Sequence, residues 1–182
     1  MGTSKAEVGI YNFAPTPAPK EGRIKLAVSL GTMTTKAIVS DPNLGGRTFD
    51  TCIARHLEDE FIAKNPKAKR VLGGDTLAQQ KAAFALMRAA TNARETLSAN
   101  TACPITVEGM APDKDFFTKL TRETFEEKCG HLFDRVTALA KEAVAASGLE
   151  LADLNAFELM GGGVRPPKIV AELSAFLGRP VD

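Results

Sequence analysis

The chain has 182 residues, 23 of them basic and 22 acidic, which leaves a formal net charge of +1, and 44% of its residues are hydrophobic. This length suffices for one domain, or two small subdomains, with a real core, and the balanced charge excludes a general attraction to nucleic acid or to a membrane surface. No apolar run is long enough to span a bilayer, and the first residues lack the apolar core of a signal peptide, so we expect a soluble, cytosolic domain.

The first part of the chain is predicted to be a β-hairpin. Residues 8–13 and 23–30 both have the pattern of short strands, and three prolines and Gly22 lie between them. We therefore expect these two strands to pair, with a long and proline-stiffened loop. Residues 36–40 form a weaker candidate for a third strand.

Two helices are predicted next. An apolar side chain recurs every four residues from Phe49 to Phe61, which is typical of a helix over 47–64. Residues 76–98 are rich in strong helix formers, and Asp75 is a suitable N-cap for that helix.

The rest of the chain alternates strands and helices. Residues 103–108 are a predicted strand, and 121–147 have the clearest helical pattern, with Thr121 as N-cap and Gly148 as stop. A short strand over 156–160 is followed by three glycines. A last helix then begins at the Pro166–Pro167 pair and ends at Gly178.

The cysteines and histidines are not expected to form a site. Cys52, Cys103 and Cys129 are widely spaced and lie among apolar neighbours, which is typical of buried free thiols in a reducing compartment. His56 and His131 lie on separate predicted helices and are expected at the surface. No catalytic or metal-binding residue is predicted.

Three stretches suggest contact with phosphate or nucleotide. FELMGGGVRPPKIV is the strongest, because a strand, three glycines and a helix N-terminus follow one another; the alternative is an ordinary strand-to-helix turn. Residues 26–42 resemble a phosphate hairpin of actin-like ATPases, but Ser29 stands where that hairpin needs an aspartate, which favours a plain hairpin. NLGGRTFD resembles DLGGGTFD, with Asn43 in place of the carboxylate.

Four runs of the chain, in this order and at these separations, resemble the second lobe of the nucleotide-binding domain of 70-kDa heat shock chaperones. They are LGGRTFDTCIARHLEDEF, ARETLS, FFTKLTRETFEEKCGHLFDRV and LMGGGVRPPKIVAELSAFLGRPV. The resemblance covers nearly the whole chain except the proline-rich loop and residues 31–39, which look like insertions. The turn MAPDKDFFTKLTRETFEEKC is similar to the large, 110-kDa class of this superfamily.

The resemblance implies an α/β (α+β) fold, namely lobe II of an actin-like ATPase with an incomplete sheet. Residues 1–46 would form the hairpin region, 47–148 a mainly helical subdomain, and 149–182 the strand, glycine loop and helix of the adenosine side. MGTSKAEV would be the remnant of the true phosphate loop, so the chain would begin just after that loop's acidic residue. NLGGRTFD would then be a later turn that launches the helix over 47–64.

The resemblance also implies contacts to the adenosine side of ATP or ADP, with Mg supplied together with the nucleotide. Thr91 stands where the family usually has Glu, and Glu95 where it has Arg or Lys. A carboxylate cannot stack on adenine as a guanidinium does, so a weaker affinity is expected. The implied nucleotide-binding residues are Gly2, Thr3, Gly46, Thr91, Arg94, Glu95, Ser98, Gly161, Gly162, Gly163 and Arg165.

The function implied is that of a cytoplasmic chaperone which assists protein folding and acts as a nucleotide exchange factor for an Hsp70 partner, with unfolded clients bound by other domains. The first lobe is absent, so this chain alone is not expected to hydrolyse ATP; weak ATPase activity is expected at most in the parent. The alternatives are a conventional ATP-hydrolysing 70-kDa chaperone, a large member from the endoplasmic reticulum, and a stand-alone α/β module for another small ligand.

Overall fold

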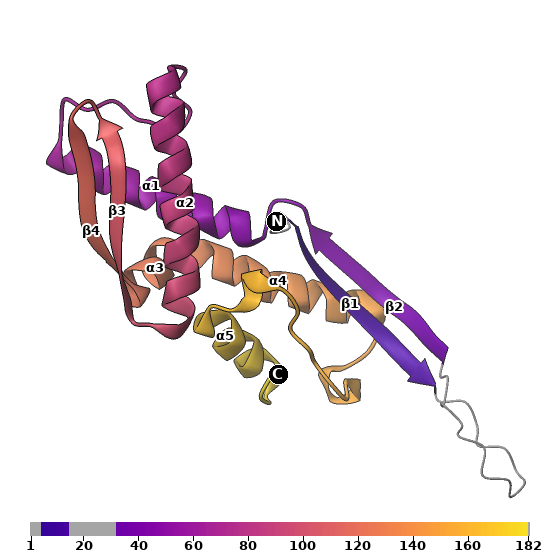
Figure 1. Ribbon diagram of the computed structural model, residues 1–182. Helices are drawn as coiled ribbons and strands as arrows, with labels where there is room; N and C mark the ends of the chain where they lie inside the picture. Colours follow the sequence, from indigo (N-terminus) through magenta and orange to yellow (C-terminus); the bar gives the residue numbers. More distant parts are fainter. Residues whose placement is uncertain (1–4, 15–31, 182) are drawn as a thin grey trace, which may run out of the picture.

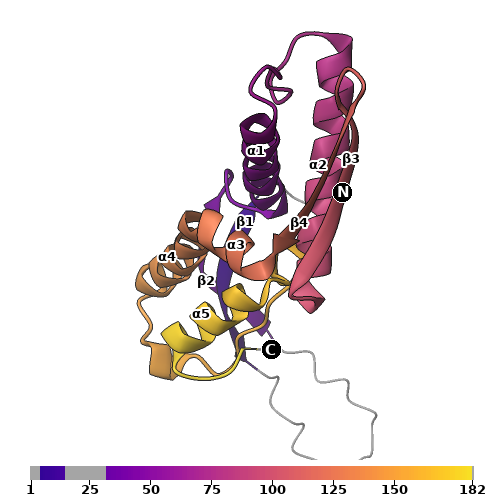
Figure 2. The ribbon, with the colours of Figure 1, turned by 90° about the vertical axis from the view of Figure 1, so that its left-hand side faces the viewer.

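The computed structural model describes residues 5–14 and 32–181, which form five α-helices and two antiparallel hairpins (Figure 1). In the two views, α1, α2, β3 and β4 form one half of the molecule, and α4, α5, β1 and β2 form the other (Figure 2). Packing between α1, α3 and α4 joins the halves. The strand predicted over 23–30 and the proline-rich loop lie outside the described residues.

The first hairpin pairs β1 (Ala6–Ala14) with β2 (Thr32–Asp41). Ala6 lies opposite Asp41 and Ala14 opposite Thr32, and the register shifts between Ile10 and Tyr11. The predicted partner of residues 8–13, the strand over 23–30, lies outside the described residues, so its pairing stays a prediction. Within the described part of the chain the weaker third strand pairs with β1, and it is longer than expected because its β-branched side chains continue toward its start.

Two predicted helices are confirmed as α1 (Gly46–Lys64) and α2 (Leu77–Ala99). The cap of α2 is Thr76 and not Asp75. Thr76 forms a capping box, in which its hydroxyl accepts from the Gln79 N–H at 3.2 Å and Gln79 Oε1 accepts from the Thr76 N–H at 3.3 Å. The apolar stripe of α1 is buried as expected: Phe49, Ile53, Leu57 and Phe61.

The second hairpin, β3 (Ala102–Ala111) and β4 (Lys114–Thr121), lies against α2. The strand over 103–108 is confirmed and extended, but β4 was not predicted. Only one face of β4 is covered, so Phe116 is buried while Phe117 is 65% exposed. Two adjacent phenylalanines conceal the alternation that identifies such a strand in a sequence.

The single helix predicted over 121–147 is two helices, α3 (Arg122–Lys128) and α4 (Gly130–Ser147), with a break at Cys129. Its predicted ends are confirmed. Thr121 Oγ1 accepts from the Thr124 N–H at 3.1 Å, and Gly148 closes α4 in the left-handed conformation. At the break, three aromatic rings pack together: Phe49, Phe125 and Phe133.

The C-terminal segment contains two short 3-10 turns and one helix. The turns span Leu151–Asp153 and Gly162–Val164, and α5 (Pro167–Leu177) packs on α4, with Gly178 as its left-handed cap. The strand predicted over 156–160 is wrong. In the described part of the chain this segment has no strand beside it, and a strand without a partner has no hydrogen-bond ladder to stabilise it.

The prediction of three free thiols is also wrong. Cys52 of α1 forms a disulfide with Cys129 at the break between α3 and α4, 77 residues away in the sequence. Cys103 is free and buried, as expected. Spacing alone did not indicate the pair, because a bond over this separation depends on how α1 packs against α3 and α4.

Candidate functional site

The candidate site begins at the turn that leads from β2 into α1. Asp41 holds this turn, since its carboxylate accepts from the Asn43 N–H at 2.9 Å and its carbonyl accepts from the Leu44 N–H at 3.3 Å. Thr48 Oγ1 donates to the Asn43 carbonyl at 3.0 Å. Gly46 is the first residue of α1, where backbone N–H groups have no partner within the helix.

A buried ion pair joins α1 to α2 one turn further along. Arg94 Nε donates to Asp50 Oδ1 at 2.6 Å, and Thr91 Oγ1 donates to Asp50 Oδ2 at 3.0 Å. Asp50 is only 7% exposed and Arg94 only 8%. The carboxylate therefore neutralises the guanidinium and fixes its orientation.

The same guanidinium reaches the glycine loop before α5. Arg94 Nη1 donates to the Gly162 carbonyl at 3.3 Å, and a β-carbon on Gly46 would lie 3.6 Å from Arg94 Nη2. A β-carbon on Gly163 would lie 3.5 Å from the Gly46 nitrogen. The glycine loop and the start of α1 thus approach each other to van der Waals contact, with Arg94 beside both.

The structure brings together five of the predicted site residues, which come from three distant parts of the sequence. This cluster is Gly46, Thr91, Arg94, Gly162 and Gly163. The sequence did not indicate Asp50, which is the residue that organises the cluster. The one feature of the sequence that points to Asp50 is its position next to Phe49, in the apolar stripe of α1. The structure shows that this side of α1 faces α2.

The other predicted residues are at the edge of this cluster or outside it. Gly161 is exposed, with a φ of 102°, and Arg165 and Glu95 are exposed too. Ser98 donates its hydroxyl to the Glu95 carbonyl at 2.7 Å, so that hydroxyl is engaged within α2. Gly2 and Thr3 lie outside the described residues.

The cluster offers little free charge to a ligand. The charge of Arg94 is balanced by Asp50, and Arg165 is the exposed cation of the glycine loop. The backbone groups around Gly46 and Gly163 are approachable because neither residue has a side chain. This arrangement suits an uncharged, polar part of a ligand better than it suits a phosphate chain.

The described residues show neither a metal-binding cluster nor a helix that could span a membrane. They contain no group of three or more His, Cys, Asp and Glu side chains placed to hold a metal ion. Within the same residues, every helix is too short or too polar to cross a membrane.

Comparison with known proteins identifies the family. The family model described as Hsp70 protein matches residues 25–182. The chain belongs to the Hsp70 family. The expected family is thereby confirmed, and with it the expected fold class: the helices and hairpins are part of an α/β lobe of the actin-like ATPase fold.

Several heat shock proteins are similar to this Hsp70-family chain. Heat shock 70 kDa protein 17 of Arabidopsis thaliana is 33% identical over 179 residues, which are 98% of the chain and 20% of that relative. A heat shock protein homolog of Saccharomyces cerevisiae is 32% identical over 170 residues, 90% of the chain and 21% of the relative. Heat shock protein hsp88 of Neurospora crassa is 30% identical over 152 residues, 84% of the chain and 20% of the relative. The chain thus spans about a fifth of the length of the curated relatives it matches.

Proposed function

We propose that the chain is lobe II of the ATP-binding domain of a large heat shock chaperone and that its glycine–arginine cluster holds the adenosine part of ATP or ADP. The observation that carries this proposal is the convergence of five residues that the family resemblance implies as contacts on one buried ion pair: Gly46, Thr91, Arg94, Gly162 and Gly163. Membership of the Hsp70 family supports the choice of nucleotide.

Each residue of the cluster has a distinct role in this proposal. Gly46 and Gly163 leave the backbone open to the ligand, and Asp50 positions Arg94 so that its planar group lies along the site. Thr91 has no carboxylate to offer a ribose, and its hydroxyl is already donated to Asp50. Arg165 is the candidate for contact with the α-phosphate side. Mg would arrive with the nucleotide and be held by its phosphates.

A titration followed by NMR tests the nucleotide site, since chemical shifts report even millimolar affinities. We expect adenosine, ADP and ATP to shift the amide signals of the cluster with similar dissociation constants, because the cluster contributes little to phosphate binding. Tripolyphosphate should shift none of them. Absence of any adenosine-induced shift, or a stronger response to tripolyphosphate, would overturn the proposal.

A pair of glycine variants makes this test specific. Gly163→Val places a branched side chain against the Gly46 backbone and is expected to weaken adenosine binding at least about tenfold. Gly130→Val is the matched control, because nothing lies within 4 Å of a β-carbon at that position. Unchanged binding by Gly163→Val would argue against this cluster as the site.

For the whole protein we propose a cytoplasmic chaperone that assists folding of unfolded clients and accelerates ADP release from an Hsp70 partner. The exposed surfaces of α1 and α2 are the proposed contact with that partner. Stopped-flow release of a fluorescent ADP from an Hsp70 tests this role. Acceleration by the whole protein but not by the 182-residue chain alone is expected. No acceleration by the whole protein would exclude the exchange role without affecting the nucleotide site.

A second candidate is a conventional ATP-hydrolysing chaperone, since one of the similar relatives is named a 70 kDa heat shock protein. The two candidates differ in turnover. Steady-state phosphate release by the whole protein, measured without a partner, should be weak or absent for an exchange factor. Sustained hydrolysis would favour the second candidate.

A further inference from the structure

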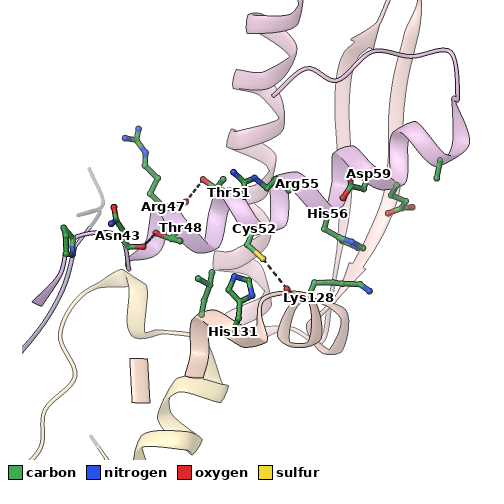
Figure 3. A pocket seen from close by; sticks show the side chains of 14 residues that line it. Asn43, Arg47, Thr48, Thr51, Cys52, Arg55, His56, Asp59, Lys128 and His131 are labelled. Carbon is green, nitrogen blue, oxygen red and sulfur yellow. Dashed lines mark hydrogen bonds between the residues drawn. The ribbon is translucent and has the colours of Figure 1, made fainter. Parts of the chain in front are cut away.

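A hollow of about 910 Å³ lies between α1 and the junction of α3 and α4, and none of the predicted nucleotide contacts lines it (Figure 3). Its volume is within the range of small-ligand sites. Cys52 of α1 is one of the residues that line it. Most of the other lining residues carry polar or charged side chains: Asn43, Arg47, Thr48, Thr51, Arg55, His56, Asp59, Glu60, Lys128 and His131.

The cations of this hollow are the groups that can attract a ligand. Arg47, Arg55 and Lys128 line it, together with two histidines. Arg47 and Arg55 form no ion pair within the part of the chain that the structure describes. Lys128 pairs with its neighbour Glu127, at 3.3 Å on the exposed surface.

The two acids of the hollow are balanced by cations outside it. Asp59 pairs with Arg70 at 2.7 Å, and Glu60 pairs with Lys64 at 2.6 Å. Neither Arg70 nor Lys64 lines the hollow. The two arginines, which have no ion-pair partner among the described residues, therefore leave this hollow with a positive charge of its own.

The disulfide presents only one of its two sulfurs to this positive cavity. Cys52 lines the hollow and is half-buried, whereas Cys129 is 1% exposed and is not part of the lining. Cys52 Sγ also lies 3.7 Å from the Lys128 carbonyl, the contact drawn in Figure 3. A thiol at this position can donate to that carbonyl and a disulfide cannot, so the reduced form of Cys52 gains a hydrogen bond.

We propose that Cys52 is a thiol–disulfide exchange site for small thiol peptides that carry carboxylates, with glutathione as the probe. The cationic lining binds the carboxylates and brings the sulfur of the ligand to Cys52. Attack by the thiolate forms a bond to Cys52 Sγ and breaks the Cys52–Cys129 bond. Cys129 leaves as a thiolate and takes up a proton.

A second small thiol completes the reaction. Its thiolate attacks the outer sulfur of the mixed disulfide, which releases the oxidised small disulfide and leaves Cys52 reduced. In total, two small thiols lose two electrons, and the protein disulfide gains them as two thiols. The reverse sequence, with the oxidised small disulfide as oxidant, restores the bond.

Rates of reduction with thiols of different charge test the proposal on the intact chain. Glutathione, neutral 2-mercaptoethanol and cationic cysteamine are compared at equal thiolate concentration, and the adducts are trapped in acid and mapped by mass spectrometry. At low ionic strength, glutathione should react about tenfold faster than cysteamine, and 1 M salt should remove the difference. The mixed disulfide should form on Cys52.

Two arginine variants distinguish the effect of a charge in the hollow from the effect of the overall charge of the protein. Arg55→Ala is expected to lower the glutathione rate several-fold and leave the 2-mercaptoethanol rate unchanged. Arg88→Ala, at an exposed position of α2 outside the hollow, is the matched control and should change neither rate. Equal rates for glutathione and cysteamine, an adduct on Cys129 or Cys103, or a reduced chain that oxidised glutathione fails to reoxidise would each overturn the proposal.

Discussion

Asp50 is the residue on which the geometry of the candidate site depends. It accepts hydrogen bonds from Arg94 at 2.6 Å, which is buried, and from Thr91 at 3.0 Å, which is partly buried. A charge-assisted hydrogen bond of this kind is stronger than a neutral one, and its planar geometry fixes the guanidinium. Arg94 can therefore lie beside Gly46 and Gly162 without an unbalanced charge in the protein interior.

Loss of this carboxylate should destabilise the fold as well as the site. We expect Asp50→Ala to lower the free energy of unfolding by about 3 kcal/mol, because Arg94 would remain buried without its partner. Asp59→Ala removes an exposed partner of Arg70 from the same helix and should cost at most about 1 kcal/mol. Urea unfolding of the two variants measures the difference. Equal losses would mean that the Asp50–Arg94 pair is no more important than a surface contact.

Sequence patterns identified several ligand-facing positions but not the groups that support them. Gly46, Arg94 and the glycine loop were predicted because a family resemblance marks them. Asp50 has no such mark, since its role depends on how α1 and α2 pack. Glu58 is a similar case, because it is buried and accepts from the Val71 and Leu72 N–H groups at 2.7 and 2.8 Å.

At the level of elements, the helices with a clear apolar period were predicted well. The regular spacing in α1 and α5, and the strong helix formers of α2, depend on local geometry alone. The partner of β1, the existence of β4 and the break between α3 and α4 depend on contacts between distant segments. The erroneous strand over 156–160 has the same cause, since a strand needs a neighbour that its own sequence does not specify.

Glycine-to-alanine substitutions at the two ends of α4 should change the stability in opposite directions. Gly148 closes the helix with a φ of 69°, where a β-carbon is strained, so Gly148→Ala should cost about 1 kcal/mol of stability. Gly130→Ala, at the start of the same helix, meets nothing within 4 Å and should stabilise the chain by about 0.5 kcal/mol. Thermal unfolding compares them. A loss of stability in both variants would contradict the assigned cap.

The ion pair between Asp41 of β2 and Arg135 of α4 should make the stability of the fold depend on pH in the acidic range. The N–H of Asn43 and, after it, the guanidinium of Arg135 lower the pKa of Asp41 from its ordinary value of 3.8. A lowered folded pKa means that the stabilisation is complete above the unfolded value and is lost as the pH falls through the folded value. We expect the urea midpoint of the wild type to fall toward that of Asp41→Asn as the pH drops below about 4.

A second variant ranks the two causes of this acid dependence. Arg135→Ala leaves the Asn43 N–H in place, so it should flatten the acid dependence less than Asp41→Asn does. Urea unfolding at several pH values between about 5 and 2.5 measures both profiles. A wild-type chain whose midpoint differs from that of Asp41→Asn by a constant amount at every pH would contradict the lowered pKa.

For the molecule as a whole, α1 is the element that connects its parts. Its first residue belongs to the candidate nucleotide site, its apolar stripe belongs to the core, and Cys52 on its flank is bonded to the start of α4. The aromatic contacts of Phe49 with Phe125 and Phe133 lie at the same junction. The disulfide therefore joins the two halves of the molecule where their packing already meets.

Reduction of this disulfide should cost more stability than any other change that can be made without a substitution. The bond closes a loop with a sequence separation of 77 residues, and the chain-entropy relation assigns such a loop about 4.5 kcal/mol. We expect a phosphine reductant to lower the free energy of unfolding by about this amount, measured by urea unfolding. Cys52→Ser should have the same free energy of unfolding with and without reductant, because it cannot form the disulfide. Cys103→Ser should lose as much stability on reduction as the wild type does, since Cys103 lies outside the disulfide. A wild-type chain with the same midpoint under both conditions would show that packing alone, without the disulfide, holds α1 to α3 and α4.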